Sequence, residues 1–302
     1  DGRYEFEGSA RFGKDLDEEK LLSDFLAALN SEQSEVTLVV TEVQPEITTP
    51  DSLRAKGVTE LLGYGYSSFS GSPANRIYNV NRGMNQFNGT LIEPGEEFSF
   101  TGNMGPIDGE HGWLPELVIK GDETVPEYGG GLCQVSSTMF RAALYTGLPI
   151  TARKNHSYAV RYYAVPFGYG LDATVYDPAP DLKFVNNTPG AILVQGYTEG
   201  SDAYFVFYGS NDGRSVKMEG PFDYNYNSVS EPAIIYTDNL EAGERELKEY
   251  AHIGFDVDWY RTIYDATGNV IGDREVIHSS YEARPPKYFE GKTEDLSSEP
   301  SS

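Results

Sequence analysis

The stretch Gly129-Gly130-Gly131-Leu132-Cys133 places the only cysteine of this 302-residue chain directly after three glycines. Apolar residues recur at helical spacing from Val135 to Leu144, and Gly147 stands where a left-handed glycine would end such a helix. The pattern predicts a helix with Cys133 in its first turn. Because a helix N-terminus carries partial positive charge and unpaired N–H groups, it stabilises a thiolate. A single thiol forms no disulfide within the chain, which excludes a structural disulfide, and the three glycines and the helix-start position favour a nucleophile over a buried small side chain.

A thiolate nucleophile needs a base, usually a histidine, and a group that orients this base. His156 is the favoured base because it follows Cys133 after one helix and one turn, and His111 is a competing candidate. Asp172, flanked by small and apolar residues, is the candidate to orient the histidine, and its alternative role is to cap a turn. These residues predict thiol-mediated acyl transfer on an amide or ester carbonyl. Whether water or an amine then takes the acyl group stays open.

Residues around the start of the helix are candidates to bind the substrate. Gly130 and Gly131, with the backbone N–H of Cys133, are candidates for an oxyanion hole because a helix start presents free donors. Ser136 and Ser137 lie one turn along the helix and are candidate hydrogen-bond donors to the substrate. The alternative for both serines is that their hydroxyls only serve the first helical turns.

The chain is strongly acidic, with 47 acidic and 23 basic residues and a formal net charge of −24. Nucleic acids and anionic lipid surfaces bind basic proteins, so we expect no nucleic-acid partner. The few basic residues include Arg153, whose planar fork suits a substrate carboxylate, and Tyr158 close by is a further candidate contact. The four histidines are far apart and no metal or cofactor motif is present, so we expect no metal and no cofactor.

Hydrophobic and turn patterns divide the chain into four segments. Residues 1–56 have a strand, helix, strand pattern that predicts a partial α/β domain, because one helix is too short to make a domain. Residues 57–225 contain the cysteine helix and form the predicted catalytic domain. Residues 226–291 carry four strand patterns separated by turns, and the polar residues 292–302 are expected to form a disordered tail.

The predicted fold class is α+β, with a mostly antiparallel sheet, a central helix that carries the cysteine at its N-terminus, and a small all-β C-terminal domain. Strand patterns at 182–185, 191–197 and 203–208 follow one another closely along the chain. A second helix is expected over 75–87. The glycine-containing stretch 101–128 is expected to form loops.

No apolar run in the sequence approaches the roughly 18–20 residues of a membrane span. The chain opens with Asp1 rather than Met, so we expect a signal or anchor to lie outside this sequence. Contact with a membrane is expected only through such an anchor.

Several motifs occur in an order that resembles the VanW domain family. They are the cysteine stretch 129–138, Gly147-Leu148, Arg153, His156-Ser157, Gly170-Leu171-Asp172-Ala173 and 181–187, with Phe98-Ser99-Phe100 and Gly105-Pro106 upstream. The match covers about 60–220. Residues 1–50 resemble the end of the peptidoglycan-binding domain that often precedes VanW, and about 229–290 resembles a G5 domain.

The resemblance implies an extracytoplasmic bacterial protein of the cell wall or envelope, membrane-anchored or secreted in its full length. VanW domains have been assigned L,D-transpeptidase activity. This implies that Cys133 attacks the L,D-peptide bond of a peptidoglycan stem tetrapeptide, releases the terminal D-alanine and passes the acyl group to an amine. Two alternatives remain: a cysteine peptidase or carboxypeptidase acting on the same stems, and a non-catalytic module that binds the cell wall.

Overall fold

The computed structural model describes residues 13–31, 35–43, 50–120 and 123–293. The chain divides into two compact units, Asp1–Glu60 and Leu61–Ser302, which are described one at a time. The predicted tail falls outside the described residues from position 294 onward. Within the described ranges, no helix is both long enough and apolar enough to cross a membrane.

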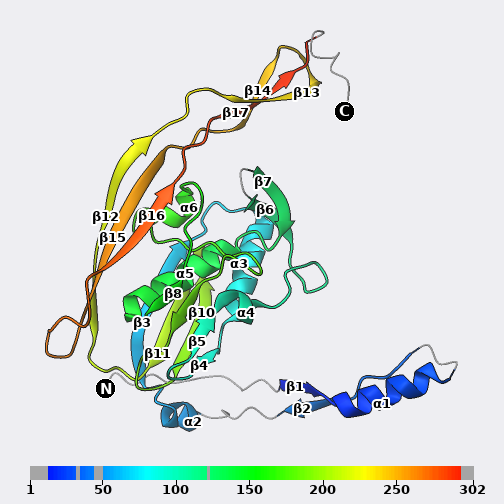
Figure 1. Cartoon of the computed structure of the whole chain (residues 1–302), viewed down its shortest axis with the longest axis vertical. Helices are drawn as coiled ribbons and strands as arrows, with labels where there is room; N and C mark the ends of the chain where they lie inside the picture. The colour runs from blue at the N-terminus through cyan, green and yellow to red at the C-terminus, as the bar shows by residue number, and fades with distance from the viewer. Residues whose placement is uncertain (1–12, 32–34, 44–49, 121–122, 294–302) are drawn as a thin grey trace. The chain divides into compact units, whose positions relative to one another are not determined.

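The first unit has the predicted order of strand, helix and strand. Its elements are β1 (Gly13–Leu16), α1 (Glu18–Leu29), β2 (Val40–Val43) and α2 (Pro50–Ala55) (Figure 1). Strand β1 pairs antiparallel with β2, and Asp17 caps α1 by accepting a 2.9 Å hydrogen bond from the N–H of Lys20.

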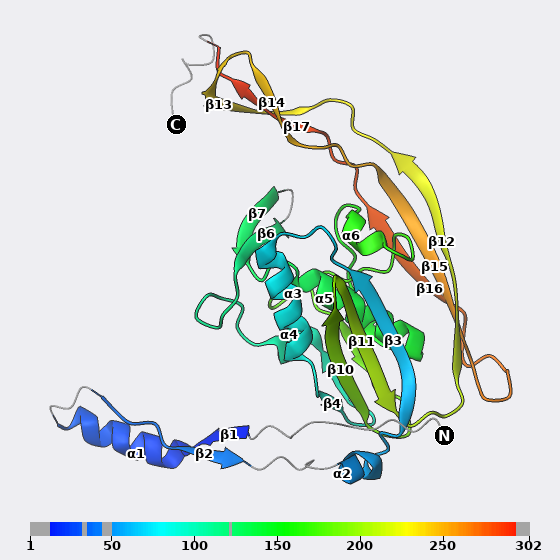
Figure 2. The same cartoon turned by 180° about the vertical axis from the view of Figure 1, so that it is seen from behind.

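In the second unit, a four-stranded sheet carries two helices on one face, as seen from opposite sides in Figures 1 and 2. Its strand order is β3 (Glu60–Ser68), β11 (Asp202–Gly209), β10 (Ile192–Glu199) and β4 (Leu91–Ile92). The helices are α3 (Ala74–Gln86) and α5 (Leu132–Thr146), both close to predicted ranges. Strands β10 and β11 match the strand patterns predicted at 191–197 and 203–208, and they pair as an antiparallel hairpin.

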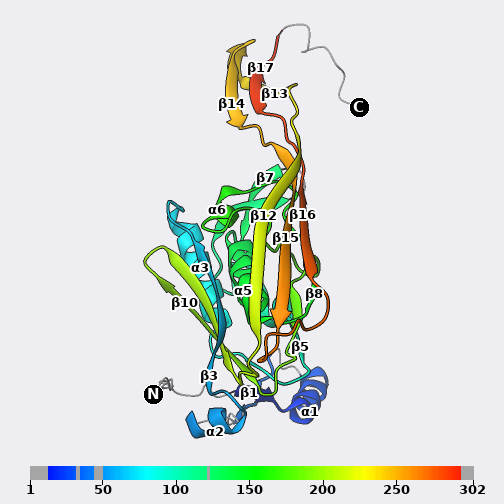
Figure 3. The same cartoon turned by 90° about the vertical axis from the view of Figure 1, so that its left-hand side faces the viewer.

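Helix α5 lies between this sheet and a second, three-stranded sheet (Figure 3). The second sheet has the order β12 (Ser215–Asn227), β15 (Gly254–Tyr264) and β16 (Glu275–Tyr281). All residues of α5 are buried except Cys133 and Tyr145. On the first side, the backbones approach so closely that a Cβ on Gly65 would lie 2.0 Å from the carbonyl oxygen of Thr138. Because both sides of α5 are covered, Cys133 is one of two places where the helix reaches solvent.

Short elements join these layers. They are β5 (Glu97–Ser99), α4 (Phe100–Met104), β6 (Pro115–Lys120), β7 (Glu123–Tyr128), β8 (Ile150–Ala152), α6 (Arg161–Ala164) and β9 (Lys183–Val185). The expected loop over 101–128 is wrong in its second half, because β6 and β7 form a hairpin with Pro115 opposite Tyr128. Four glycines of this stretch precede β6 in the sequence and Gly121 comes between the two strands, so the turn signal of glycine does not apply to the strand residues themselves.

The C-terminal strands are antiparallel except for one pair. Besides the three-stranded sheet, β13 (Ala233–Ala242) pairs parallel with β17 (Lys287–Gly291), which pairs antiparallel with β14 (Arg245–Glu249). Strand β12 continues past Gly220-Pro221 by a register shift and through the expected domain boundary at 225–226. The predicted α+β class with mostly antiparallel strands is confirmed, whereas the division at 225–226 stays a prediction.

Candidate active site

The three glycines before α5 are needed for two reasons: two of them have backbone angles that favour glycine, and one has no room for a side chain. Gly129 and Gly131 have φ angles of 81° and 114°, in the left-handed region. Gly130 has no room for a side chain, because a Cβ there would lie 2.7 Å from the Cβ of Glu116 and 2.9 Å from its carbonyl carbon. The tight packing fixes the position of Cys133, two residues beyond Gly131.

The structure brings together Cys133, His156 and Asp172. The Nδ1 atom of His156 lies 2.6 Å from Oδ2 of Asp172, and the backbone N–H of His156 donates to the same oxygen at 2.7 Å. The His156 imidazole also interacts with the thiol of Cys133. Since Nδ1 is held by the carboxylate, Nε2 is the ring atom left to exchange a proton with sulfur. The order of groups is that of a nucleophile, a base and an orienting acid.

The charges of this cluster stabilise one another. Burial alone would lower the pKa of His156, but its hydrogen bond with Asp172 and its interaction with the nearby Cys133 raise the pKa to about 9. Burial raises the pKa of the Cys133 thiol, and the neighbouring His156 outweighs this and lowers it below its usual value. Both shifts act in the direction of a thiolate beside an imidazolium.

The contact between His156 and Cys133 is not a fully formed hydrogen bond. The Nε2 atom is buried and, among the described residues, has no hydrogen-bond partner at standard geometry. The thiol instead donates to the carbonyl oxygen of Val175 at 3.6 Å. The two groups are close enough to influence each other's charge, and loosely aligned catalytic contacts of this kind tighten when substrate binds.

Asp172 is held as an anion by residues from distant parts of the chain. Its Oδ1 accepts a 2.5 Å hydrogen bond from the hydroxyl of Tyr281, in β16, and lies 3.4 Å from Nη2 of Arg153. Burial would raise the pKa of Asp172, but its bonds and charge interactions with His156, Arg153 and Tyr281 hold the pKa well below its usual range. An ionised Asp172 keeps His156 in the orientation that leaves Nε2 free.

Tyr163, in α6, stacks on the His156 ring with centroids 4.3 Å apart and planes at 18°. Burial raises the pKa of Tyr163, so its hydroxyl remains neutral. The Tyr163 hydroxyl also interacts with the guanidinium of Arg76 in α3. Stacking and the bond to Asp172 together fix the imidazole plane.

Ser136 and Ser137 are fully buried and bond to the protein. Ser136 Oγ donates to the carbonyl oxygen of Ala173 at 2.6 Å, and Ser137 Oγ donates to the carbonyl oxygen of Cys133 at 2.6 Å. The N–H of Ala173 in turn donates to Ser137 Oγ at 2.9 Å. These bonds attach the start of α5 to the segment after Asp172, which matches the alternative of helix-start hydroxyls better than contact with substrate.

Arg153 is likewise committed to protein groups. Its Nε donates to the Asp172 carbonyl oxygen at 2.6 Å, and its Nη2 donates to the Gly170 carbonyl oxygen at 2.9 Å and to Ser279 Oγ at 2.8 Å. Its Nη1 donates to the carbonyl oxygen of His278 at 3.0 Å. Because Nε, Nη1 and Nη2 all donate to protein groups, the guanidinium connects Asp172 to β16 and is not available to bind a substrate carboxylate.

Two other candidates lie apart from this cluster. The Tyr158 ring packs against His252 at 4.4 Å and under the Arg284 guanidinium at 4.2 Å. His111 is exposed, with Nδ1 2.7 Å from Asp108 Oδ1, and none of the interactions found for Cys133 involves it. Geometry therefore favours His156 over His111 as the base.

Sequence reasoning did not single out Tyr163, Arg76 or Tyr281. Tyr281 lies far down the chain, in a strand whose register alone brings it to Asp172. Arg76 is one of two basic residues, with Arg82, in a helix that is otherwise rich in asparagine, and this is the sequence signal that could have drawn attention to it. Among the described residues, no group of three or more His, Cys, Asp or Glu side chains is arranged to hold a metal ion.

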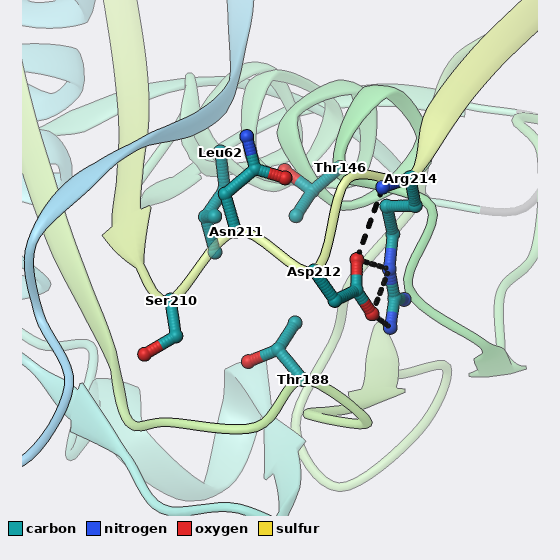
Figure 4. Close-up of a pocket in the computed structure, with 7 residues that line it drawn as sticks. All are labelled: Leu62, Thr146, Thr188, Ser210, Asn211, Asp212 and Arg214. Carbon is teal, nitrogen blue, oxygen red and sulfur yellow. Dashed lines mark hydrogen bonds and ion pairs between the residues drawn. The ribbon is translucent and has the colours of Figure 1, made fainter. Parts of the chain in front are cut away.

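A surface pocket elsewhere in the unit contains none of the predicted site residues (Figure 4). In it, Arg214 forms a 2.5 Å ion pair with Asp212 and donates to Oδ1 of Asn187 at 2.7 Å. The charge of this arginine is already compensated by its neighbour. The pocket is lined by Leu62, Thr146, Thr188, Ser210, Asn211, Asp212 and Arg214.

The chain is similar to known proteins over the part that holds this cluster. Residues 75–208 match the family described as VanW like protein. The chain is 29% identical over 202 residues to the uncharacterized protein YoaR of Bacillus subtilis, across 67% of this chain and 65% of that protein. It is 32% identical over 117 residues to the vancomycin B-type resistance protein VanW of Enterococcus faecalis, across 38% of this chain and 42% of that protein. The chain spans less than two thirds of either relative's length.

Arg76, Cys133, His156 and Asp172 all lie within the matched residues 75–208, and Tyr281 lies beyond them. The chain therefore carries a VanW-like domain over residues 75–208.

Proposed function

We propose that this chain is a cysteine-dependent L,D-transpeptidase that cross-links peptidoglycan stem peptides through a thioester on Cys133. The observation that carries the proposal is the arrangement of Cys133 at the positive end of α5, beside a His156 whose other ring nitrogen is held by Asp172. This arrangement stabilises a thiolate and supplies a proton donor at the same place. The similarity of residues 75–208 to the VanW family supports a substrate in the cell wall.

In the first half of the reaction, the Cys133 thiolate attacks the carbonyl carbon of the L,D-peptide bond, and the carbonyl oxygen becomes an oxyanion. Backbone N–H groups at the start of α5, around Gly131 and Cys133, are our candidates to stabilise it. As the C–N bond breaks, the His156 imidazolium gives its Nε2 proton to the amine of the departing D-alanine. The acyl group is left as a thioester on sulfur.

In the second half, an amine of a neighbouring stem attacks the thioester carbonyl. Neutral His156 accepts a proton from this amine, the C–S bond breaks, and the electron pair returns to Cys133 as a thiolate. The products are a new amide cross-link and the original thiolate and imidazolium pair. Water in place of the amine would give hydrolysis by the same steps.

We infer an extracytoplasmic protein of the envelope, with residues 1–56 as a partial peptidoglycan-binding-like domain and 226–291 as a G5-like β domain. The partners are stem peptides, and the acidic net charge of −24 disfavours nucleic acid.

The test is product analysis by mass spectrometry after incubation with tetrapeptide muropeptides. The unchanged chain is expected to give dimers with loss of D-alanine, and Cys133→Ser, which keeps the shape of the side chain, is expected to give none. His111→Ala serves as the matched histidine control and is expected to retain the product. Dimers from Cys133→Ser would exclude the thioester route, shortened monomers without dimers would indicate a carboxypeptidase, and sacculus binding without products would indicate a wall-binding module.

A further inference from the structure

Arg76 lies beside the start of α5, although it belongs to α3. A Cβ added to Gly131 would lie 3.3 Å from Cγ of Arg76 and 3.4 Å from its carbonyl oxygen. The arginine stem therefore packs against the glycine that caps the cysteine helix. Arg76 is buried, with 8% of its surface exposed, so its guanidinium is held in place by its surroundings.

Aromatic rings connect this guanidinium to the catalytic histidine. Cζ of Arg76 lies 4.3 Å from the centroid of the Tyr162 ring, a cation–π arrangement. The next residue, Tyr163, interacts with Arg76 through its hydroxyl and stacks on His156 with ring centroids 4.3 Å apart. Arg76 and Cys133 thus border the same tyrosine and histidine pair, one from α3 and the other from α5.

Arg76 has fewer acceptors within the protein than two other buried arginines. Arg141 is fully buried and donates to four backbone carbonyl oxygens, and Arg261 pairs with Glu275. The Nη1 of Arg76 donates to Ser72 Oγ at 2.8 Å, and among the described residues no carboxylate pairs with it. A buried cation without an anion or a full set of acceptors is costly. An anion from outside the chain would compensate the charge of Arg76.

We infer that Arg76 binds a carboxylate of the peptide substrate beside Cys133. Under the proposed function, on which this refinement rests, the ligand is the terminal carboxylate of the D-alanine that leaves. The planar guanidinium accepts a carboxylate in two parallel hydrogen bonds, so it would orient the peptide as well as attract it. In this inference Arg76, and not the Arg153 predicted from the sequence, binds the substrate carboxylate.

The experiment compares two alkylating agents that differ in charge, iodoacetate and iodoacetamide, on the full chain. Each forms a bond from the Cys133 sulfur to carbon and expels iodide, so neither depends on transpeptidation. Removing a charge-assisted hydrogen bond of this kind is expected to slow reaction with anionic iodoacetate by about tenfold in Arg76→Gln. The rate with neutral iodoacetamide is expected to stay within about twofold, because the thiolate itself is retained.

Arg82→Gln is the matched control, since Arg82 is also in α3 and also lies over an aromatic ring, that of Trp113. It is expected to leave both rates unchanged, and Arg76→Lys is expected to recover part of the iodoacetate rate. Equal slowing with both agents in Arg76→Gln would show a structural role, and no slowing would show that Arg76 binds no carboxylate. Either result overturns the inference, while failure of Cys133→Ser to abolish cross-linking would overturn only the proposed function.

Discussion

The hydroxyl of Tyr281 donates a 2.5 Å hydrogen bond to Oδ1 of Asp172, which joins the last strand of the three-stranded sheet to the residue that holds His156. Arg153 strengthens this connection by bonding both the Asp172 carbonyl oxygen and Ser279 Oγ in β16. The strands beyond the VanW-like residues 75–208 thus support the candidate active site directly. The hydrogen bonds around Asp172 are incomplete without them.

Replacement of Tyr281 by Phe tests this support. Because the hydroxyl bonds the charged form of Asp172, its loss is expected to raise the pKa of Asp172 and lower kcat/KM by about tenfold or more, the usual effect of losing a bond to a charged group. The acid limb of the pH profile is expected to move to higher pH. Tyr224→Phe is the control, since Tyr224 donates to Asp258 at 3.1 Å on the exposed side. An unchanged profile in Tyr281→Phe would mean that the strand does not position the acid.

The pH dependence of Cys133 alkylation tests the ion pair. The lowered pKa of the thiol predicts that the thiolate is present below the pH at which an ordinary cysteine ionises. His156→Ala is expected to move the alkylation profile to higher pH, because burial then acts on the thiol without a compensating cation. His111→Ala is expected to leave the profile in place. The reverse pattern between the two variants would make His111 the base.

The raised pKa of His156 predicts the alkaline limit of activity. The imidazolium that protonates the leaving amine is present below the folded pKa and is lost as the pH rises through about 9. The interactions that raise the pKa also stabilise the fold fully below the unfolded value of about 6.5, and this contribution disappears as the pH rises through about 9. Both kcat and the midpoint of urea unfolding are expected to fall in that range. A rate that is flat through pH 10 would exclude His156 as the proton donor.

Asp172→Asn removes the anion that three side chains surround. His156 and Arg153 then remain buried without their counter-charge, which is expected to cost about 3–5 kcal/mol of unfolding free energy. The variant is also expected to lose most cross-linking, because an amide no longer favours the imidazolium. Urea unfolding and muropeptide analysis measure the two effects separately. A variant of normal stability and normal rate would remove Asp172 from the site.

Ser137→Ala distinguishes attachment of the helix from binding of substrate. Ser137 bonds Cys133 and Ala173 within the protein, so its removal is expected to lower the unfolding free energy by about 1–3 kcal/mol. KM is expected to stay near its normal value. The partly exposed Ser68, which donates to the carbonyl oxygen of Ser201 at 3.3 Å, provides the control Ser68→Ala. A raised KM with unchanged stability would restore the substrate-binding role.

Local patterns were sufficient to predict several elements of the fold. Helix α5 and its left-handed end at Gly147 follow from the spacing of apolar residues and from glycine, and strands β10 and β11 follow from two adjacent strand patterns. Strands β3 and β12 were missed because their partners lie far away in sequence. The β6–β7 hairpin was missed because glycines before it suggested a longer loop.

The sequence alone determined the candidate nucleophile: a single cysteine at a glycine-led helix start is a local arrangement, and local patterns specify helix termini. It also named His156 and Asp172, which the tertiary structure then placed within hydrogen-bond distance of each other. Only the tertiary structure paired Arg153 with Asp172, brought Tyr281 to the same carboxylate, and left Arg76 without a carboxylate partner among the residues that it describes. The physical reason is that charge compensation in a buried site depends on which side chains meet in space, and sequence spacing does not encode those distances between separate strands and helices.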